Sequence, residues 1–352
     1  MQRSQDISPF TENQLILITG ASGFIGSHLT HTILASSRPV RIRLLARPSS
    51  NLTAFEGQPN VEAVRVSRWD DVDRLRDAFR QVDYAFNTAG AVVDWGKWED
   101  FENANITMAR RLVEAAVAEY QRPDSRMKRF LHISTADVYG YPGNSPSEDV
   151  PPRDIGLPYI TTKIAGEAAV LSAKGQLPVT VVRPATVYGP RSKDFVLEIA
   201  TLLKPRMMPL VNGEVGAGLI HVDDLVDGLI KAAASPNAVG QIYNLCGEDH
   251  VTWRCYVNRL AEKLGYPRPF LSLPFGVLFS FGYLLESLYR LFGWYSSRPL
   301  LTRHAVYLMG RDQHVPIDKA KRELGFQPRI SVDTGVDQCV AWLKTLPQFR
   351  SS

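Results

Sequence analysis

The feature that most constrains the fold of this chain is a regular alternation between two kinds of segment. Short apolar runs rich in branched residues are separated by longer segments whose apolar residues have helical spacing. Repeated strand–helix–strand order of this kind predicts a parallel sheet covered by helices on both faces. The predicted strands are residues 14–19, 40–45, 61–66, 83–88, 128–134, 178–183 and 241–245, and the predicted helices are residues 24–36, 72–80, 101–120, 159–174 and 222–234.

The alternation weakens after residue 190, where prolines become frequent and residues 247–310 show no repeat of strand and helix. We therefore predict an α/β fold made of a doubly wound parallel sheet and a smaller, mostly helical lobe. The sheet domain is expected to comprise residues 12–190 and 219–246, and the lobe residues 191–218 and 247–345. Such a lobe would cover the carboxyl edge of the sheet, where ligands of these sheets bind.

Composition narrows the class of protein. A chain of 352 residues with 45% hydrophobic residues can bury a large core. The net charge of +4 is too small and too scattered to indicate nucleic-acid binding. Three cysteines without metal-ligand or disulfide spacing (Cys246, Cys255 and Cys339) indicate a reducing, cytoplasmic environment and no metal. Residues 1–13 are polar, so we expect no secretion signal, and no apolar stretch reaches the length of a membrane span.

Three glycines, each three residues apart, follow the first predicted strand in the stretch LILITGASGFIGSHL. We expect Gly20 to allow a tight turn, Gly23 to let the backbone approach a pyrophosphate, and Gly26 to let the helix pack closely on the sheet. The helix that begins near Phe24 would direct its free N–H groups toward the phosphates. The sequence therefore predicts a dinucleotide-binding turn made of Gly20, Ser22, Gly23, Phe24, Ile25 and Gly26.

Further motifs follow along the chain. They are NTAG (87–90), NANITMARRLVEAA (103–116), HISTADVYG (132–140), YITTK (159–163), RPATVYGP (183–190) and HVDDLVDG (221–228). With TGASGFIG, these motifs resemble the extended short-chain dehydrogenases/reductases, the NAD-dependent epimerase/dehydratase superfamily, over residues 12–246. The resemblance implies a Rossmann domain and a homodimer formed through helices 101–120 and 159–174. It also implies cofactor contacts by Thr88, Ala89, Gly90, Lys163, Pro184, Thr186 and Val187.

Tyr159 and Lys163 are four residues apart on a predicted helix, so their side chains share one face. An ammonium beside a phenol favours the phenolate, so we expect Lys163 to lower the pKa of Tyr159 from its usual value of about 10. Tyr159 could then exchange a proton with a carbinol or carbonyl oxygen. The resemblance implies that Lys163 also holds the nicotinamide ribose.

A hydroxyl that binds the same substrate oxygen is expected in HISTADVYG. The resemblance places Thr135, rather than Ser134, at the position of the family's catalytic Ser or Thr, and leaves Ser134 to support the turn. Asn105 resembles the asparagine whose backbone contacts stabilise the active site in the family. As a single asparagine, Asn105 could equally be structural.

The second predicted strand, VRIRLLARPSS, ends without the Asp or Glu that binds the ribose diol of NAD. Arg47 stands there instead, with Ser22 and Ser49 as further donors for a 2′-phosphate. The third strand ends in VSRWDD, so Arg68 replaces the Asp that the family usually places beside the adenine. Arg68 could stack on the adenine, add charge near the 2′-phosphate or point to solvent, and Trp69 could line the adenine. These departures favour NADP(H), with NAD(H) as the alternative.

Nucleotide-sugar epimerases and dehydratases usually carry an aromatic–Asn pair after the Arg of the sixth strand, and the Asn binds the diphosphate. Here the same stretch is RPATVYGPR, with Ala185 and Thr186, which argues against a nucleotide sugar. Together with AVVDWGKWEDFENAN, it more closely resembles the 3β-hydroxysteroid and sterol-4-carboxylate dehydrogenases.

The segment PFGVLFSFGYLLESLYRLFGW, residues 274–294, carries an apolar stripe at helical spacing. The residues of this stripe are 277, 281, 284, 285, 288, 291 and 292, with Glu286 and Arg290 on the more polar side. Two interpretations are open: a helix buried in the lobe, or a helix in peripheral contact with a membrane. Both interpretations predict an apolar lid that suits a lipophilic substrate.

The sequence thus predicts an NADP(H)-dependent oxidoreductase that interconverts a secondary alcohol and a ketone on a steroid- or terpenoid-like substrate. The specific case is a 3β-hydroxysteroid or sterol-4-carboxylate 3-dehydrogenase, which would yield a β-keto acid that loses CO₂. The alternatives are a nucleotide-sugar epimerase or dehydratase, a natural-product or flavonoid-type ketone reductase, and a protein that keeps the cofactor fold without turnover. The set of Thr135, Tyr159 and Lys163 argues against the last alternative.

Overall fold

The computed structural model describes residues 9–36, 39–212 and 214–350. Most of the N-terminal stretch that we expected to carry no secretion signal, residues 1–8, lies outside the described residues. The same holds for residues 37–38 of the predicted sheet domain and residue 213 of the predicted lobe.

A seven-stranded parallel sheet forms the centre of the protein, with the strand order β10-β6-β5-β4-β1-β2-β3. The chain winds outward from β1 in both directions, so the doubly wound α/β fold predicted from the sequence is confirmed. The register pairs Ile16 of β1 with Ile42 of β2 and with Tyr84 of β4. The strands are β1 (Leu15–Thr19), β2 (Arg41–Ala46), β3 (Val61–Arg65), β4 (Tyr84–Asn87), β5 (Arg129–Ile133), β6 (Val179–Pro184) and β10 (Gln241–Leu245).

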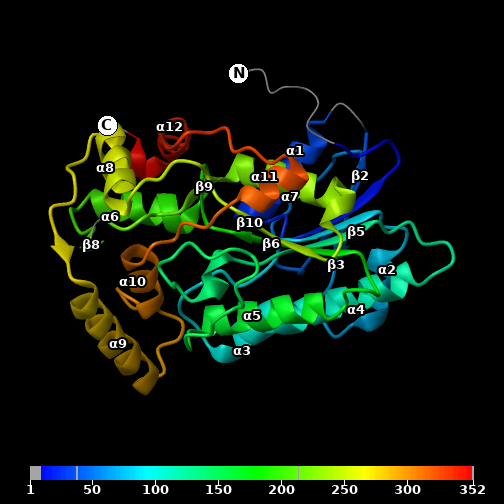
Figure 1. Ribbon diagram of the computed structural model, residues 1–352, viewed down its shortest axis with the longest axis horizontal. Helices are drawn as coiled ribbons and strands as arrows, with labels where there is room; N and C mark the ends of the chain where they lie inside the picture. The colour runs from blue at the N-terminus through cyan, green and yellow to red at the C-terminus, as the bar shows by residue number, and fades with distance from the viewer. Residues whose placement is uncertain (1–8, 37–38, 213, 351–352) are drawn as a thin grey trace.

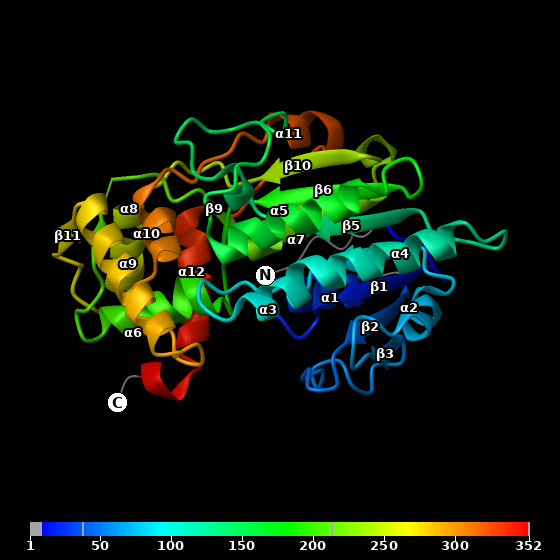
Figure 2. The same cartoon turned by 90° about the horizontal axis from the view of Figure 1, so that it is seen from below.

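Helices cover both faces of this sheet, as Figures 1 and 2 show. Every residue of β1 and β5 is buried, because a parallel strand in a sheet with two covered faces has apolar contacts on both sides. One face carries α1 (Phe24–Leu34), α7 (Val222–Ala234) and α11 (Asp318–Leu324). The other carries α2 (Val72–Phe79), α4 (Met108–Tyr120) and α5 (Pro158–Leu171).

The helix predicted over 101–120 has a more varied geometry than expected. It begins as α3 (Trp98–Phe101), continues as a π-helical turn, η1 (Glu102–Thr107), and becomes α4 only at Met108. A π-helical turn carries one residue more than an α-helical turn, and such turns are often found at functional sites. Two 3₁₀ turns flank the sheet, η2 (Ala136–Tyr139) after β5 and η4 (Pro236–Ala238) before β10.

A mostly helical lobe lies at the end of the sheet toward which β10 points in Figure 2. Its core joins residues before and after β10, among them Val196, Leu219, Trp253, Tyr256 and Val336. Two small parallel pairs, β7 (Thr186–Tyr188) with β9 (Leu219–His221) and β8 (Leu210–Val211) with β11 (Ser272–Leu273), complete it. Its helical elements are η3 (Lys193–Glu198), α6 (Ile199–Leu203), α8 (Trp253–Leu264), α9 (Phe275–Leu291), α10 (Arg303–Gly310), α12 (Val332–Leu343) and η5 (Pro347–Phe349).

Helix α9 lies on the outside of the lobe against α10 (Figure 1). The interpretation of residues 274–294 as a helix buried through its apolar stripe is wrong. The buried residues of α9 are Leu278, Gly282 and Glu286, whereas the stripe faces away from the protein. The physical reason is that Glu286 is paired with Arg303 of α10, so the polar side of the helix is the attached side. Among the described residues, no helix is long and apolar enough to cross a membrane.

Candidate active site

The glycine turn follows β1 at the carboxyl edge of the sheet. Gly20 has a positive φ of +74°, and a Cβ built on it would lie 2.8 Å from the Ala89 nitrogen at the end of β4. A Cβ on Gly26 would lie 2.3 Å from the Gly20 carbonyl oxygen, so any side chain there would push α1 away from the turn. The two glycines therefore hold the start of α1 against the ends of β1 and β4.

The start of α1 is open to a ligand. Ser22 and Gly23 are exposed, and Phe24 and Ile25 are half-buried. Gly23 is the N-cap of α1 and offers no side chain to bind the free N–H groups of the first helical turn. Such a helix start suits a phosphate group.

The ends of β2 and β3 carry three arginines with different partners. Arg47 is exposed, and within the described part of the chain its guanidinium has no hydrogen-bond or ion-pair partner. Arg65, which the sequence analysis missed, donates to the carbonyl oxygens of Arg47, Pro48 and Ser50 at 2.9–3.1 Å. It thereby fixes the loop that carries Arg47.

Arg68 and Trp69 differ in how far they can serve a cofactor. Arg68 is 78% exposed and forms a two-pronged pair with Asp70 at 2.6 and 2.9 Å. Of the three roles considered for Arg68, the structure supports the last one: its side chain points to solvent, where Asp70 pairs with its charge. Trp69 is half-buried against the core beneath α2.

The end of β4 is tied to the end of β1. The Thr88 hydroxyl donates to the Thr19 carbonyl at 2.6 Å, and the Ala89 nitrogen donates to the Thr19 hydroxyl at 3.2 Å. Gly90 is exposed and follows directly. Pro184 and Thr186 are buried and Val187 is half-buried at the end of β6. These six predicted contacts thus lie at or after the ends of β4 and β6.

Asn105 holds the β4–α3 loop against α5. Its side chain accepts from the Ala91 nitrogen at 2.9 Å and donates to the Thr162 hydroxyl at 3.0 Å. A Cβ on Gly166 of α5 would lie 2.2 Å from the Asn105 carbonyl oxygen, so the two backbones are in close contact. The Asn105 side chain therefore has a structural role, and the backbone role that the resemblance implies stays a prediction.

The two hydroxyls after β5 differ in their hydrogen bonds. Thr135 is buried and accepts from the Asp137 nitrogen at 3.2 Å, and its hydroxyl acts to lower the pKa of Tyr159. Ser134 is also buried, but its hydroxyl has no partner among the described residues. The expected turn-supporting role of the Ser134 side chain is therefore wrong, and Thr135 caps the 3₁₀ turn instead.

Tyr159 and Lys163 are both buried on α5. Burial raises the pKa of Tyr159, the charge of Asp137 raises it further, and the hydrogen bond from Thr135 lowers it. Burial also lowers the pKa of Lys163 to about 8, with Glu167 and Asp137 acting in the opposite direction. The expectation that Lys163 sets a low pKa for Tyr159 is wrong for this structure, because desolvation is the larger effect. The ammonium donates to the Ile133 carbonyl at 2.7 Å.

Sequence reasoning missed a cluster around Tyr159. His304 of α10 is buried, and its ring lies on that of Tyr159 with centroids 5.2 Å apart. Its Nε2 lies 3.1 Å from the Tyr141 hydroxyl and 3.6 Å from the Asp137 carboxylate. No local pattern marks His304, since it belongs to the lobe and to none of the motifs.

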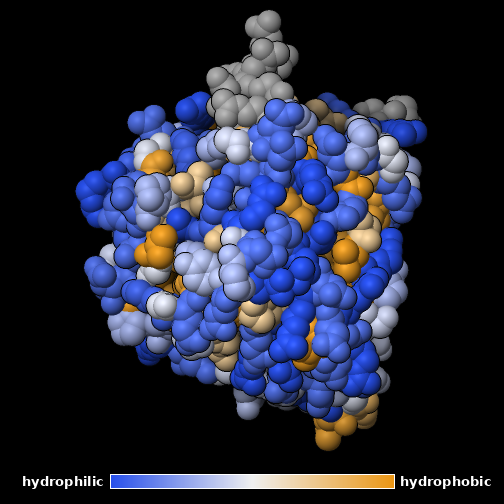
Figure 3. Space-filling model, turned by 90° about the vertical axis from the view of Figure 1, so that its right-hand side faces the viewer, coloured by the Kyte–Doolittle hydropathy of each residue, from blue (hydrophilic) through white to orange (hydrophobic). Residues whose placement is uncertain are grey.

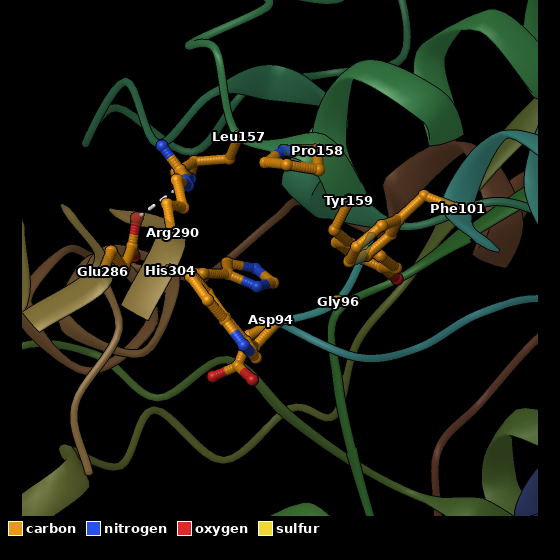
Figure 4. A pocket seen from close by; sticks show the side chains of 10 residues that line it. Asp94, Gly96, Phe101, Leu157, Pro158, Tyr159, Glu286, Arg290 and His304 are labelled. Atoms are coloured by element: carbon orange, nitrogen blue, oxygen red, sulfur yellow. Dashed lines mark hydrogen bonds and ion pairs between the residues drawn. The ribbon is translucent and has the colours of Figure 1, made fainter. Parts of the chain in front are cut away.

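A pocket opens in front of Tyr159 and joins the sheet domain to the lobe (Figure 4). In Figure 4, Tyr159 and Phe101 form one wall, Glu286 and Arg290 form the opposite wall, and His304 lies between them. The empty space, counted out to open solvent, is about 320 Å³. The remaining lining residues are Asp94, Trp95, Gly96, Leu157 and Pro158.

The charges of this pocket are neutralised by neighbours. Arg298 holds both carboxylate oxygens of Asp94 at 2.6 Å, and the Thr302 hydroxyl donates to one of them at 2.7 Å. Glu286 accepts from the Arg303 side chain at 2.9 Å and from Arg290 at 3.3 Å. The predicted pair of Glu286 and Arg290 is thus present.

The residues at the sheet edge fit a dinucleotide. Gly20 and Gly26 leave no room for a Cβ, so α1 begins close to the strand ends. The first turn of α1 has no side-chain cap, so its N–H groups can bind a ligand. The Ser134 hydroxyl is buried without a partner beside Thr135. Where β2 ends, Arg47 presents an exposed cation that no described residue pairs with. A phosphate-bearing cofactor would supply partners for all of these groups.

Comparison with known proteins gives a family. Residues 16–246 match the model of the NAD-dependent epimerase/dehydratase family. The chain is 27% identical over 328 residues to the 4-hydroxy-2-methyl-3-oxo-4-farnesyl-3,4-dihydroquinoline-1-oxide ketoreductase of Stigmatella aurantiaca, covering 91% of this chain and 94% of that protein. It is 28% identical over 339 residues to sterol demethylase protein B of Methylococcus capsulatus, covering 93% and 98%.

A solved structure agrees in fold. The UDP-glucuronic acid 4-epimerase of Bacillus cereus, in complex with UDP-glucuronic acid and NAD, matches with a TM-score of 0.74 at 22% identity. The match covers 94% of this chain and 99% of that one. At this identity the likeness shows the fold alone.

Proposed function

Because this chain belongs to the NAD-dependent epimerase/dehydratase family, we propose that it is an NADP(H)-dependent oxidoreductase acting on a lipophilic, ring-bearing alcohol or ketone. The coarser statement, an NAD(P)-dependent enzyme acting on CH–OH groups, follows from the family. The choice of coenzyme, the class of substrate and the roles of single residues are the proposal. The specific substrate pair that we favour is a 3β-hydroxysteroid or sterol-4-carboxylate and the corresponding 3-ketone.

The observation that carries the proposal is a proton donor at the wall of a pocket that three aromatic side chains line, Trp95, Phe101 and Tyr159 itself. Tyr159 lines the pocket, and the Thr135 hydroxyl acts to lower the pKa of Tyr159. When bound, the nicotinamide supplies or accepts the hydride at the carbinol carbon. Tyr159 exchanges the proton at the oxygen on that carbon, and Thr135 orients the same oxygen. Lys163 binds the ribose through its ammonium group.

The electrostatics favour ketone reduction. Burial raises the pKa of Tyr159, so the phenol keeps its proton at neutral pH. A protonated phenol is ready to donate to a carbonyl oxygen, which is the step that reduction requires. The preference for NADPH points the same way, because cells keep that coenzyme reduced.

The pocket supports a lipophilic substrate over a nucleotide sugar. Trp95, Phe101 and Leu157 supply apolar surface, and Arg290 is the one arginine or lysine of its described lining. Arg290 is already paired with Glu286. A diphosphate needs unpaired cations or N–H donors, whereas a ring system needs apolar contact area. The ketoreductase and sterol relatives act, by their names, on lipophilic ring compounds, which also supports this choice.

Turnover assays test the proposal. Purified protein is incubated with NADPH or NADH and a panel of steroid, terpenoid and flavonoid ketones, and coenzyme oxidation is followed by absorbance. We expect steady NADPH oxidation with at least one steroid or terpenoid ketone. Turnover of UDP-sugars without net coenzyme consumption would instead establish the epimerase alternative, and preference for flavonoid ketones would establish the natural-product reductase.

Coenzyme choice has its own test. Arg47→Ala removes the unpaired cation at the end of β2, so we expect about tenfold weaker NADPH binding and little change for NADH. Arg76→Ala serves as the matched control, because Arg76 is another exposed arginine and lies on α2, where it is near Asp73. Equal losses for both coenzymes would contradict a role in binding the 2′-phosphate.

We also propose a homodimer formed through α4 and α5. Arg110, Glu114 and Ala168 are exposed on these helices, so their outer faces are available for contact. Sedimentation velocity of the purified protein tests this, and a monomer at assay concentration would contradict it.

A further inference from the structure

We propose that the outer face of α9 docks the protein onto the surface of a phospholipid bilayer. The docking face consists of the exposed part of the apolar stripe on α9 and the exposed apolar residues of the segment that follows it. From here on, the stripe means its exposed members on α9, which are Val277, Phe281, Leu284, Leu288 and Leu291. The residues that follow it are Phe292, Trp294 and Leu300. This inference goes beyond the proposed function and concerns a different part of the molecule.

The apolar stripe is a continuous exposed surface. Its five residues follow one another at steps of four, three, four and three, so they share one face of the helix. Each of them is between 40% and 77% exposed. Scattered single apolar residues are normal on a protein surface, but a contiguous row of this length marks a site of contact. The end of the molecule shown in Figure 3 is mainly hydrophilic by comparison, with apolar atoms in small separate spots.

The attachment of α9 fixes the direction in which the stripe points. Glu286 lies on the opposite face, is 3% exposed, and accepts from the Arg303 nitrogen at 2.7 Å and the Arg303 guanidinium at 2.9 Å. A Cβ on Gly282 would lie 3.3 Å from the backbone of Thr302 and Arg303, so α9 and the start of α10 are in close contact. Turning the helix to bury the stripe would expose this ion pair and break the contact.

Charge and aromatic content point to a lipid surface as the occupant. Residues 269–302 contain three charged residues, Glu286, Arg290 and Arg298. Glu286 is buried, Arg290 is paired with Glu286, and Arg298 is paired with Asp94 and Glu198, so none of the three leaves an unpaired charge beside the stripe within the described part of the chain. Tyr283 and Trp294 are both more than half exposed beside the stripe. Tyrosine and tryptophan are enriched where apolar and headgroup regions of a bilayer meet, and an amphipathic helix lies in that plane.

The docking face adjoins the pocket. Glu286 and Arg290 of α9 line the pocket in front of Tyr159 (Figure 4), and the stripe lies on the other side of the same helix. Docking would therefore bring the pocket close to the bilayer, from which a lipophilic substrate could enter. This last consequence rests on the proposed function, whereas the docking itself does not.

Vesicle cosedimentation tests the inference with the full-length protein. The vesicles are phosphatidylcholine alone or phosphatidylcholine with phosphatidylglycerol. We expect the wild-type protein to sediment with both, because the docking face binds through apolar and aromatic side chains. The combined variant Phe281→Ser, Leu284→Ser and Leu288→Ser should reduce the bound fraction at least tenfold. Its turnover of a water-soluble ketone should not change, since none of the three residues lines the pocket.

A matched variant controls for the general loss of surface hydrophobicity. Val72→Ser, Tyr120→Ser and Val239→Ser remove three side chains that are 40–49% exposed on the sheet domain. This control should bind vesicles as the wild type does. If the control loses binding to the same extent as the stripe variant, adsorption is nonspecific and the inference is overturned.

Two further outcomes separate the alternatives. If the wild type reduces ketones but sediments with neither vesicle, the docking inference is overturned and the proposed function stands. If the stripe variant changes a dimer to a monomer in sedimentation velocity and vesicle binding is absent, the stripe is a contact between two copies, which also overturns it. Vesicle binding without turnover of any ketone would support docking and contradict the proposed function.

Discussion

Helices α5 and α9 both bury charged side chains, but they differ in where their large apolar residues lie. On α5, Lys163 and Glu167 are buried among apolar neighbours, and the outer face carries small residues such as Ala168. On α9, Glu286 is buried and the large apolar residues face outward. A helical pattern of apolar residues therefore does not by itself identify the buried face of a helix. On α9, the bond between Glu286 and Arg303 of α10 determines which side of the helix packs against the lobe.

The largest effect should come from the reacting end of α5. Tyr159→Phe removes the proton donor and leaves the ring in place, so turnover should fall roughly 10²–10⁴-fold while coenzyme binding changes little. Tyr120→Phe, on the exposed end of α4, is the matched control and should retain full activity. Ketone reduction within tenfold of wild type in Tyr159→Phe would refute the assignment of the proton donor.

The next largest effect should be on the free energy of unfolding, through the buried ion pair that joins α5 to the sheet. Glu167 bonds Arg183 of β6, and both side chains are 2% exposed. Glu167→Ala would leave a buried arginine without its partner, so the free energy of unfolding should fall by about 3–5 kcal/mol. Glu114→Ala breaks the exposed pair with Arg111 and should cost at most about 1 kcal/mol. Denaturant unfolding of both variants measures the difference, and equal losses would contradict it.

Coenzyme binding should depend on pH through Lys163. Because burial lowers its pKa to about 8, the cation predominates below that pH and is lost above it. Coenzyme affinity should therefore weaken by about tenfold per pH unit above about pH 8. The unfolded lysine keeps its proton up to about pH 10.4, so this group makes the folded state more stable as the pH rises between the two values.

Titrations of coenzyme fluorescence at several pH values measure this dependence. Lys163→Met should bind weakly at every pH and lack the step. A wild-type affinity that is flat between pH 7 and pH 10 would show that the Lys163 charge does not contribute to binding.

The smallest effect should come from the exposed face of α9. Leu288→Ser alters a side chain that faces away from the lobe, so the free energy of unfolding in solution should change by less than about 0.5 kcal/mol. Leu278→Ala, on the attached face of the same helix, should cost about 2–5 kcal/mol because it leaves a cavity. Similar losses in both variants would show that the stripe packs against the protein.

Much of the sheet domain could be predicted from the sequence, because its information is local. The strands after which Gly20, Thr88 and Thr135 lie were recognisable from apolar runs, and parallel strands bring their carboxyl ends to one edge. The family was recognisable from the motifs and is confirmed by the match over residues 16–246.

The rest depended on contacts between distant residues. His304 reaches Tyr159 across 145 positions of sequence, and Arg298 reaches Asp94 across 204. The pKa of Tyr159 was predicted in the wrong direction, because its burial depends on the cluster of Phe101, Tyr141 and Leu157 around it. The outward direction of the α9 stripe depended on Arg303, which no helical pattern within 274–294 contains.

The π-helical turn η1, Glu102–Thr107, determines where the chain can accept insertions and deletions. Phe101 lines the pocket before the turn, and Asn105 within it bonds Ala91 and Thr162. Deleting one residue there would let the helix continue with α geometry and rotate Phe101 by about 100° relative to α4. Insertions and deletions should therefore be tolerated poorly between residues 91 and 108, and far better in the exposed loop at 142–145.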